Sequence, residues 1–323
     1  MPTNRKKVED LVERLYPSLL KAFQKALDDW RANLDLSAIE DALRRGDIET
    51  AVRAANIQPA ALNGFLTARE AAFEAAGTAE LSSLRLNIIF NARHLRGEAM
   101  LERYGAQFVQ AVSDDTKAML RTSLTDSLAR GQGAKAAARG IRDMIGLTDS
   151  QAGWAINLRQ KLENAPESLL SEFAADGYKL RDKRLDGIVR RAVTAGKPIA
   201  AADVEKIVTA YQNRAIRWRL ENIARTETLR AVQAGNFEAY QQAAESGKIA
   251  AQNIRKVWNS AHDKRVRHTH RELDGESVGL NERFVSSSGA QLRYPLDETA
   301  PLAETLNCRC NLTYRVDHLA NIR

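Results

Sequence analysis

The chain has 323 residues, enough for one large domain or for two or three ordinary ones. Its formal net charge is +7, from 48 Lys and Arg against 41 Asp and Glu, and basic and acidic residues alternate along most segments. This moderate charge excludes the dense basic surface of a dedicated nucleic-acid binder and is typical of solvated helix faces. The two cysteines exclude a disulfide framework and fit assembly in a reducing cytoplasm.

No apolar stretch of the sequence approaches the roughly 20 residues that a helix needs to span a bilayer. The first residues, M-P-T-N-R-K-K-V-E-D-L, lack the apolar core of a signal peptide. We therefore expect a soluble protein whose function requires no membrane.

The first 250 or so residues show mainly helical periodicity. Apolar residues spaced by three and four follow one face of residues 6–32, where Pro17 predicts a kink or a break. Shorter helical patterns follow over residues 36–54, 60–76, 114–130, 134–145 and 166–197. Gly77 predicts the end of the helix over 60–76. The apolar run over 86–90 fits a short strand less well than a buried helix, because strong helix formers flank it.

The longest helical pattern begins at Asp203 and continues to Gly247. At about 1.5 Å per residue, an unbroken helix of this length would extend roughly 60 Å, which is long for a globular core. Gly235 is the position at which this helix could divide. Upstream, Thr148 followed by Gln151 matches a capping box that opens a further helix.

After Gly247 the pattern changes to short alternating segments and turn residues. The predicted elements are a strand over 254–258, a turn at Asp274 and Gly275, a loop over 286–289, a brief pairing over 292–295 and a last strand over 308–316. The fold class is therefore mainly α, with a long-helix N-terminal body and a small C-terminal α+β module. The predicted domains are an N-terminal helical region over 1–112, a helical body with the long helix over 113–246 and the C-terminal module over 247–323.

His270, Cys308 and Cys310 form the first candidate site. Zinc takes four tetrahedral ligands, usually as two closely spaced pairs. Side chains two apart on a strand point the same way, so the C-x-C pair disfavours a mutual disulfide and suits joint ligation of a metal. Three residues could complete a second pair with His270: His262, Asp263 and His268. The alternative is a buried cysteine that packs as a small apolar residue beside a hydrogen-bonded histidine.

The segment H-T-H-R-E-L-D-G suggests a second chemistry. His268 and His270, with Asp263 upstream, fit a metal-dependent nuclease or hydrolase in which histidine acts as a base or as a metal ligand. That nuclease pattern needs a following helix with a further His or Asn, whereas a loop-rich segment follows here. The sequence favours the alternative, a polar network in which Asp263 pairs with Arg265 or Arg267.

The motif I-A-R-T-E-T places Arg225 and Glu227 within the long helix. They could form an ion pair within this helix or between helices. On a surface such a pair contributes about 0–1 kcal/mol, and when buried it fixes register at a cost in stability. No catalytic role follows from these residues, and the sequence contains no Gly-rich phosphate loop, no G-x-S-x-G and no H-E-x-x-H.

Four motifs follow one another along the chain: I-A-R-T-E-T-L-R-A, V-W-N-S-A-H-D-K-R-V-R-H-T-H-R-E-L-D-G, L-R-Y-P-L-D and N-C-R-C. In this order and spacing they resemble the phage Mu F-like family of minor head, or head morphogenesis, proteins. The upstream segment S-L-A-R-G-Q-G-A-K-A-A-A-R-G-I-R-D-M-I-G-L-T is also similar to that family. The resemblance covers roughly residues 114–316, with 158–202 as an insertion.

The resemblance implies a structural protein of a tailed-phage virion that is associated with the portal vertex and acts in head assembly, DNA packaging or genome ejection. The implied location is the interior of the phage head, after assembly in the host cytoplasm. The implied partners are the portal protein and other capsid proteins, with self-association and non-specific contact with packaged double-stranded DNA as further expectations. We expect no enzymatic activity. The alternatives are the metal-dependent nuclease or hydrolase described above and a DNA-binding ejection protein.

Members of this family carry C-x-x-C where the chain has Arg267-x-x-His270, and their cysteines resemble a zinc site. The resemblance therefore implies a structural zinc that has lost one ligand at Arg267 and keeps His270, Cys308 and Cys310. The other interpretation is that Arg267 donates to Asp263 or Asp274 and closes the same fold without a metal. The implied structural centre consists of Asp263, Arg265, Arg267, His270, Asp274, Gly275, Asn307, Cys308, Arg309 and Cys310.

Overall fold

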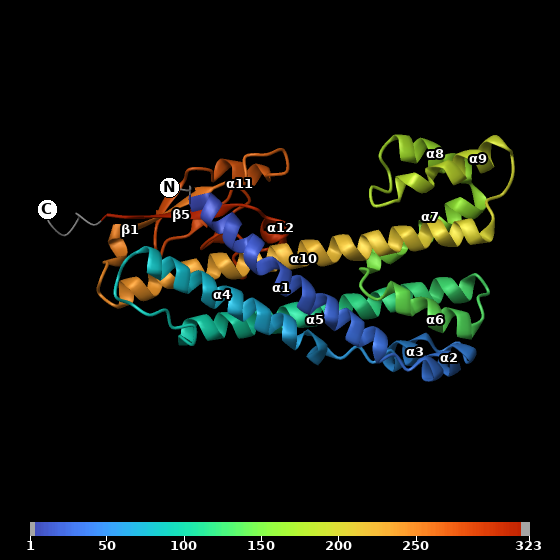
Figure 1. Ribbon diagram of the computed structural model, residues 1–323, viewed down its shortest axis with the longest axis horizontal. Coiled ribbons are helices and arrows are strands. Elements are labelled where there is room, and N and C mark those ends of the chain that lie inside the picture. Colours follow the sequence, from blue (N-terminus) through green and yellow to red (C-terminus); the bar gives the residue numbers. More distant parts are fainter. Residues whose placement is uncertain (1–3, 318–323) are drawn as a thin grey trace. The chain divides into compact units, whose positions relative to one another are not determined.

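The computed structural model describes residues 4–317. The helices of its larger part are α1 (Asn4–Ala32), α2 (Leu36–Arg44), α3 (Ile48–Ala54), α4 (Asn63–Ser83), α5 (Leu95–Ala129), α6 (Ala134–Met144), α7 (Asp149–Asn164), α8 (Pro166–Ala174), α9 (Asp186–Thr194) and α10 (Ala201–Glu245) (Figure 1). The C-terminal module consists of β1 (Ile254–Asn259), α11 (His268–Glu272), β2 (Ser277–Gly279), β3 (Phe284–Val285), β4 (Gln291–Leu292), α12 (Leu302–Thr305) and β5 (Asn311–Val316). The predicted fold class, mainly helical with a small α+β module at the C-terminus, is confirmed.

Close packing divides the chain into two compact units. The first unit contains the residues up to Phe23, Leu62–Gln107 and the residues from Asn222 onward, and the second contains Gln24–Ala61 and Phe108–Glu221. The three domains predicted from the sequence, over residues 1–112, 113–246 and 247–323, stay a prediction. No helix within residues 4–317 combines the length and the hydropathy that a membrane span requires.

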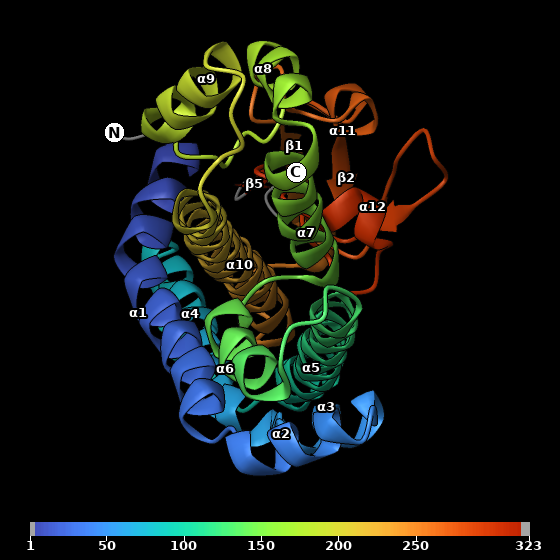
Figure 2. The same ribbon diagram turned by 90° about the vertical axis from the view of Figure 1, so that its right-hand side faces the viewer.

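The second unit has a core formed by α7, α8, α9 and the first part of α10. Its buried members are Ala155, Leu158, Leu162, Leu169, Phe173, Val189, Ile199, Val204, Ile207, Val208 and Tyr211. Helices α8 and α9 lie side by side in this unit (Figure 2). Helix α7 begins with the predicted capping box, in which the Thr148 hydroxyl accepts the Gln151 N–H and the Gln151 side chain accepts the Thr148 N–H, each at 3.0 Å.

Two glycines of the first unit that suggested helix ends lie inside unbroken helices. Helix α10 continues through Gly235, and α4 continues through Gly77. A Cβ atom at Gly235 would lie 2.3 Å from the backbone oxygen of Phe73 in α4, and one at Gly77 would lie 2.2 Å from Cζ of Phe90. The predicted ends are therefore wrong, because these glycines let other parts of the fold approach closely and do not terminate helices.

The sequence also suggested a kink or a break at Pro17 and a single helix over residues 36–54. Helix α1 continues through Pro17 without a break; Pro17 and Glu13 are both exposed, so water can reach the Glu13 carbonyl that loses its helical donor. The single helix expected over 36–54 is instead divided into α2 and α3. Gly46 adopts a φ of 73°, and Asp47 then caps α3 by accepting the Thr50 N–H at 2.9 Å.

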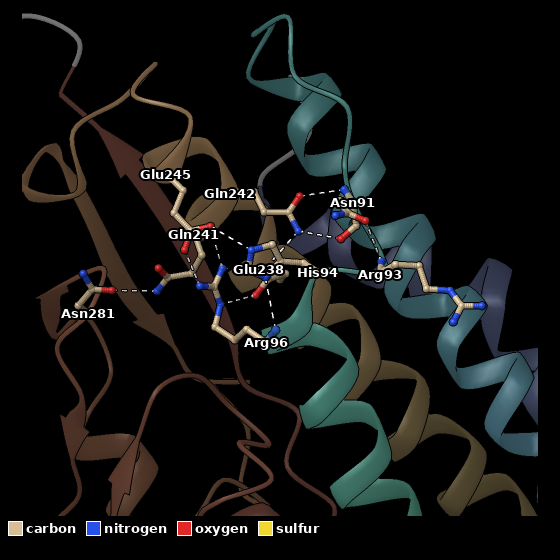
Figure 3. A network of polar contacts seen from close by, with 9 residues as sticks. All are labelled: Asn91, Arg93, His94, Arg96, Glu238, Gln241, Gln242, Glu245 and Asn281. Atoms are coloured by element: carbon tan, nitrogen blue, oxygen red, sulfur yellow. Dashed lines mark hydrogen bonds and ion pairs between the residues drawn. The ribbon is translucent and has the colours of Figure 1, made fainter.

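Residues 84–94 form an irregular segment, in place of the helix or strand expected from their apolar run. Arg85 has a φ of 55°, which ends α4, and Phe90 is buried. The side chain of Gln242 in α10 accepts the Asn91 N–H at 2.8 Å and donates to the Asn91 carbonyl at 2.9 Å (Figure 3). A side chain of α10 therefore supplies the hydrogen bonds that regular structure would otherwise give this segment.

The C-terminal module is built on a three-stranded antiparallel sheet of order β2-β1-β5, in which β2 lies beside β1 (Figure 2). In the central strand, Lys256 pairs with Val278 of β2 and with Tyr314 of β5. Strands β3 and β4 form a separate pair across the loop at 286–289. The predicted first strand, this loop and the turn at Gly275, whose φ is 81°, are confirmed.

The last strand is shorter than predicted. It begins at Asn311, whereas the alternation of apolar residues suggested a start at Cys308. Asn307 adopts a φ of 56°, and the Cys308 N–H donates to the Thr305 carbonyl at 3.1 Å. The two cysteines therefore lie on a turn that connects α12 to β5.

Candidate metal centre in the C-terminal module

His270 and the two cysteines come together inside the module. His270 lies on α11, a short helix that the sequence did not predict, and its Nδ1 atom is 3.4 Å from Cys308 Sγ and 3.6 Å from Cys310 Sγ. All three side chains are buried, and their ligand atoms lie within 4.8 Å of one another. The expected juxtaposition is therefore present, although a turn and not a strand places the sulfurs.

These distances suit a tetrahedral zinc ion. Zinc binds histidine nitrogen at about 2.0 Å and cysteine sulfur at about 2.3 Å, so a nitrogen and a sulfur on one tetrahedral ion lie roughly 3.6 Å apart. The two measured separations, 3.4 and 3.6 Å, agree with this value. One histidine and two cysteines are also a donor set that zinc prefers. The residues present therefore fit three of four positions around a zinc ion.

The two thiols differ in proton affinity. A hydrogen bond with Cys308 lowers the pKa of Cys310, and the contact with His270 acts in the same direction. The same pairing, together with burial, raises the pKa of Cys308 well above its usual value. Because thiolate and not thiol binds metals, metal binding at this pair of cysteines would release the thiol protons that the pair still holds.

Glu304 of α12 lies beside His270. Its Oε2 atom lies 2.9 Å from His270 Nε2, on the side of the ring away from the sulfurs. Burial raises the pKa of Glu304, but hydrogen bonds from Ser288 and Thr269 and the charge of His270 outweigh it, so the net shift is downward. A carboxylate behind a metal-binding histidine fixes the ring orientation and raises the basicity of the ligand.

Sequence reasoning missed Glu304 and also Trp258, whose ring packs edge-on against His270 at 5.1 Å. The available signal was weak. Glu304 precedes Cys308 by four residues, and Trp258 lies at the end of the predicted first strand. The sequence distances of Glu304 and Trp258 from the candidate ligands match no pattern that would identify them as contacts of a metal-binding residue.

Arg267 occupies the remaining side of the centre. It donates to the backbone carbonyl of Leu306, and not to Asp263 or Asp274 as the second interpretation expected. A cavity of about 10 Å³ adjoins Arg267 and the three candidate ligands, which is close to the space that one water molecule needs. Within residues 4–317, His270, Cys308 and Cys310 are the one group whose geometry could hold a metal ion, and it offers three ligand atoms.

The other predicted members of the centre form a polar cluster beside it. Asp263 pairs with Arg309 at 2.6 Å and accepts the backbone N–H of Arg265 at 2.8 Å. The hydrogen bond from Arg309 is the largest cause that lowers the pKa of Asp263, to about 2. Asp274 accepts the Ser260 N–H at 2.7 Å. This arrangement corrects the expected pairing of Asp263, whose side-chain partner is neither Arg265 nor Arg267 but Arg309.

The three residues of the hydrolytic hypothesis do not face a common point. His270 is buried against the sulfurs, whereas His268 is exposed and lies 3.4 Å from Glu272 on its own helix. Asp263 is paired with Arg309. The structure thus brings His270 to the cysteines and leaves His268 and Asp263 with other partners.

A depression of about 540 Å³ on the module surface contains Ser260, His262 and Asp274. The Ser260 hydroxyl lies 3.4 Å and the Asp274 carboxylate 3.6 Å from the same nitrogen, Nδ1 of His262. A nucleophilic relay needs its base and its orienting carboxylate on opposite ring nitrogens. This trio therefore lacks the geometry of a hydrolase triad.

Polar contacts with α10 hold the module in place within the first unit (Figure 3). Arg96 binds both carboxylate oxygens of Glu238, at 2.8 and 2.9 Å, and reaches Glu245 at 2.6 Å. On the other side of α10, Gln241 donates to Asn281 between β2 and β3 at 2.9 Å. The C-terminal end of α10 is thus tied both to the start of α5 and to the module.

Lys256 is completely buried at the centre of the sheet and donates to the carbonyls of Glu282 and Arg293, at 2.7 and 2.9 Å. Burial lowers the pKa of Lys256 from its ordinary value of 10.5 to about 7. Between these pH values the unfolded chain binds the additional proton. The unfolding free energy is therefore expected to rise with pH above about 7, by up to about 1.4 kcal/mol per pH unit.

Denaturation in urea at pH 7 and pH 9 checks this dependence. Lys256→Met should remove the rise and lower stability overall, because two buried carbonyls lose their donor. Lys264→Met, at an exposed position of the same module, serves as the control and should retain the rise. Equal pH slopes for the wild type and Lys256→Met would show that Lys256 keeps an ordinary pKa.

Comparison with known proteins identifies the region that contains the centre. Residues 183–313 match the family described as Phage Mu protein F like protein. This range includes residues 183–202, which belong to the segment expected as an insertion. No solved structure matches the chain.

Two curated proteins are similar to the chain. Minor head protein GP7 of Bacillus phage SPP1 is 37% identical over 94 residues, which is 29% of either chain. NAD(+)–arginine ADP-ribosyltransferase EFV of Enterococcus faecalis is 27% identical over 228 residues, which is 65% of this chain and 44% of that protein. The chain thus matches less than half the length of both relatives. Residues 183–313 of the chain are therefore similar to the phage Mu protein F-like family, and part of the chain is similar to a minor head protein.

Proposed function

We propose that the chain is a minor head protein of a tailed phage, which acts as a structural component in head assembly. The observation that carries this proposal is the coincidence of two matches: the similarity of residues 183–313 to the Mu F-like family and the 37% identity to a minor head protein of phage SPP1. The helical body suits this role, since long helices offer extended surfaces to neighbouring subunits. The interior of the phage head is the proposed location, after assembly in the host cytoplasm.

The proposed partners are the portal protein and other capsid proteins. Basic residues on exposed helix faces would tolerate packaged double-stranded DNA, because phosphate contacts of this kind are independent of sequence and weaken steeply with salt. Affinity capture with the purified portal protein of the same phage tests the partnership. We expect specific retention of the chain by the portal protein, and the portal partnership fails if retention is no greater than that by an unrelated capsid subunit.

We propose that this role is not enzymatic. The candidate base His270 is buried between sulfur atoms and Glu304, and the other two candidates, His268 and Asp263, have separate partners. The Enterococcus relative is named as a transferase, and its match with this chain covers 44% of that protein. Incubation of the chain with double-stranded DNA and divalent metal ions should give no cleavage. Cleavage that disappears in His270→Ala would overturn the proposal.

We also propose that His270, Cys308 and Cys310 bind one structural zinc ion. The support lies in the distances between the ligand atoms, the complete burial of the group and the carboxylate of Glu304 behind His270. A bound zinc would crosslink α11 to the turn before β5 and so stabilise the module. Elemental analysis of the purified chain tests zinc occupancy.

A further inference from the structure

The excess positive charge of the chain is concentrated in one short stretch. Residues 177–200 contain seven Lys and Arg but only two Asp and no Glu, which leaves a net charge of +5. The whole chain carries +7, so this stretch contributes most of the excess. It contains α9 and the segments that enter and leave this helix. Its basic residues are Lys179, Arg181, Lys183, Arg184, Arg190, Arg191 and Lys197.

Helix α9 buries one face and exposes the other. The residues that face the core of the second unit are Ile188, Val189, Ala192 and Val193. Because successive residues of a helix are about 100° apart, Arg190 and Arg191 fall on the opposite face, and both are exposed. Gly187 and Thr194 lie between the two arginines around the helix. The outer face of α9 therefore carries two long cationic side chains that are separated by short residues.

The two acidic residues of the stretch are already paired. Asp186 binds Arg181 at 3.2 Å, and Arg181 is itself buried. Asp182 binds Arg184 at 2.7 Å and Arg214 of α10 at 3.2 Å. These pairs neutralise charge at the start of α9, and they leave the outer face of the helix without a carboxylate.

Three basic side chains at the end of the stretch have no such partner. Arg190, Arg191 and Lys197 are exposed, and none of them forms an ion pair or a side-chain hydrogen bond with any other residue that the structure describes. The backbone holds Lys197 close to the arginines. Gly196 adopts a φ of 61°, and the Lys197 N–H donates to the Ala192 carbonyl at 3.0 Å, which ends the helix. The three residues form what we name the outer α9 surface.

The chemistry of the outer α9 surface fits phosphate better than a protein partner. Protein interfaces depend on apolar and aromatic anchors that become buried on binding. Within the described part of the chain, no large exposed apolar side chain lies in residues 166–200. Lys and Arg without such anchors are the residues that contact the DNA backbone, where the phosphates supply a regular row of negative charge.

We propose that Arg190, Arg191 and Lys197 bind the phosphate backbone of double-stranded DNA. The inference rests on the DNA contact proposed above for exposed helix faces, and it assigns that contact to one surface. Such binding is independent of base sequence. Each neutralised phosphate contributes about 0.9 to the slope of log affinity against log salt concentration, so the three side chains together contribute roughly 2.7.

Fluorescence anisotropy of a labelled DNA duplex, measured from about 50 to about 200 mM salt, tests the proposal. A triple variant with Arg190→Gln, Arg191→Gln and Lys197→Gln should lower the slope by roughly 2.7 and weaken binding by about tenfold or more at the lower salt concentration. Circular dichroism should show an unchanged fold, because all three side chains are exposed and unpaired within residues 4–317. An unchanged slope in a folded triple variant would overturn the proposal.

A second triple variant on α6 is the matched control. Lys135→Gln, Arg139→Gln and Arg142→Gln remove the same kinds and number of charges from exposed positions. There, however, Asp143 is exposed beside Arg139 and Arg142, and α6 lies apart from α9 within the second unit (Figures 1 and 2). The control should keep the slope of the wild type. An equal loss in both variants would contradict a specific surface on α9, because binding would then follow the total charge.

Competition with polyglutamate separates DNA from an acidic protein surface. We expect polyglutamate to displace the duplex only at a large excess of charge, and displacement at equal charge would contradict the assignment to DNA. Capture by the portal protein separates this inference from the proposed head-protein role. A chain that binds DNA through α9 but is not retained by the portal protein refutes only the portal partnership. A chain that the portal protein retains but that binds no DNA refutes only the outer α9 surface.

Discussion

Replacement of Gly235 by alanine should strongly destabilise the first unit. The added Cβ would lie 2.3 Å from the Phe73 carbonyl oxygen and 3.0 Å from Ala76 Cβ, and both neighbours belong to the buried face of α4. Backbone atoms cannot rotate away as a flexible side chain can, so α4 and α10 must move apart. We expect a loss of about 3 kcal/mol in unfolding free energy, at the upper end of the cost of overpacking a core. Urea denaturation followed by circular dichroism measures this loss.

Gly64→Ala is the matched control. Gly64 also lies in α4, but no atom lies within 4 Å of the Cβ that alanine would add there. This substitution should leave stability unchanged or raise it by about 0.4–1 kcal/mol, because it reduces the freedom of the unfolded chain. If Gly235→Ala and Gly64→Ala had the same effect, the close approach of α4 and α10 at Gly235 would be refuted.

His270→Ala should abolish zinc binding by the C-terminal module. It removes the one nitrogen ligand and leaves two neighbouring thiols, which cannot fill a tetrahedral site. Arg267→Cys should have the opposite effect, since a cysteine there would restore the ligand that the family resemblance implies. Glu304→Gln should weaken binding by about 10–100-fold, the usual effect of losing a partner behind a metal ligand. Competition with a chromophoric chelator measures all three affinities.

His268→Ala supplies the control for these variants. Its side chain is exposed on the same helix and faces Glu272, so its removal should leave the zinc affinity unchanged. Equal zinc affinity in His268→Ala and His270→Ala would rule out the proposed ligand set. An Arg267→Cys variant that binds no more tightly than the wild type would show that the fourth position is not at residue 267.

The candidate ligands were predictable because their chemistry is distinctive. Two cysteines and a histidine in a short C-terminal region are informative in a chain that has few of either residue. Glu304 was not predictable, because a single glutamate resembles the other acidic residues of a highly charged chain. Its role depends on the packing of α12 against α11, which the sequence does not specify locally.

The presence of the main helices was predictable from the sequence, but several of their boundaries were not. Apolar spacing indicated α1, which buries one face, and α10, whose residues 230–240 are buried on every side. The capping box of Thr148 and Gln151 indicated α7. Glycine gave the wrong boundaries at Gly77 and Gly235, since the same residue can end a helix or admit a close neighbour. Only the packing partner distinguishes these roles. In the same way, the hydrogen bonds of Asn91 in the irregular segment 84–94 come from Gln242 on α10, which the local sequence does not reveal.

The most direct test of the proposed head-protein role is co-sedimentation with procapsids of the same phage. Purified chain is mixed with procapsids that contain the portal protein and, in parallel, with procapsids that lack it, and each mixture is separated on a density gradient. We predict that the chain migrates with the portal-containing particles and stays near the top of the gradient with the others. Recovery of the chain only near the top in both gradients would contradict its assignment as a minor head protein.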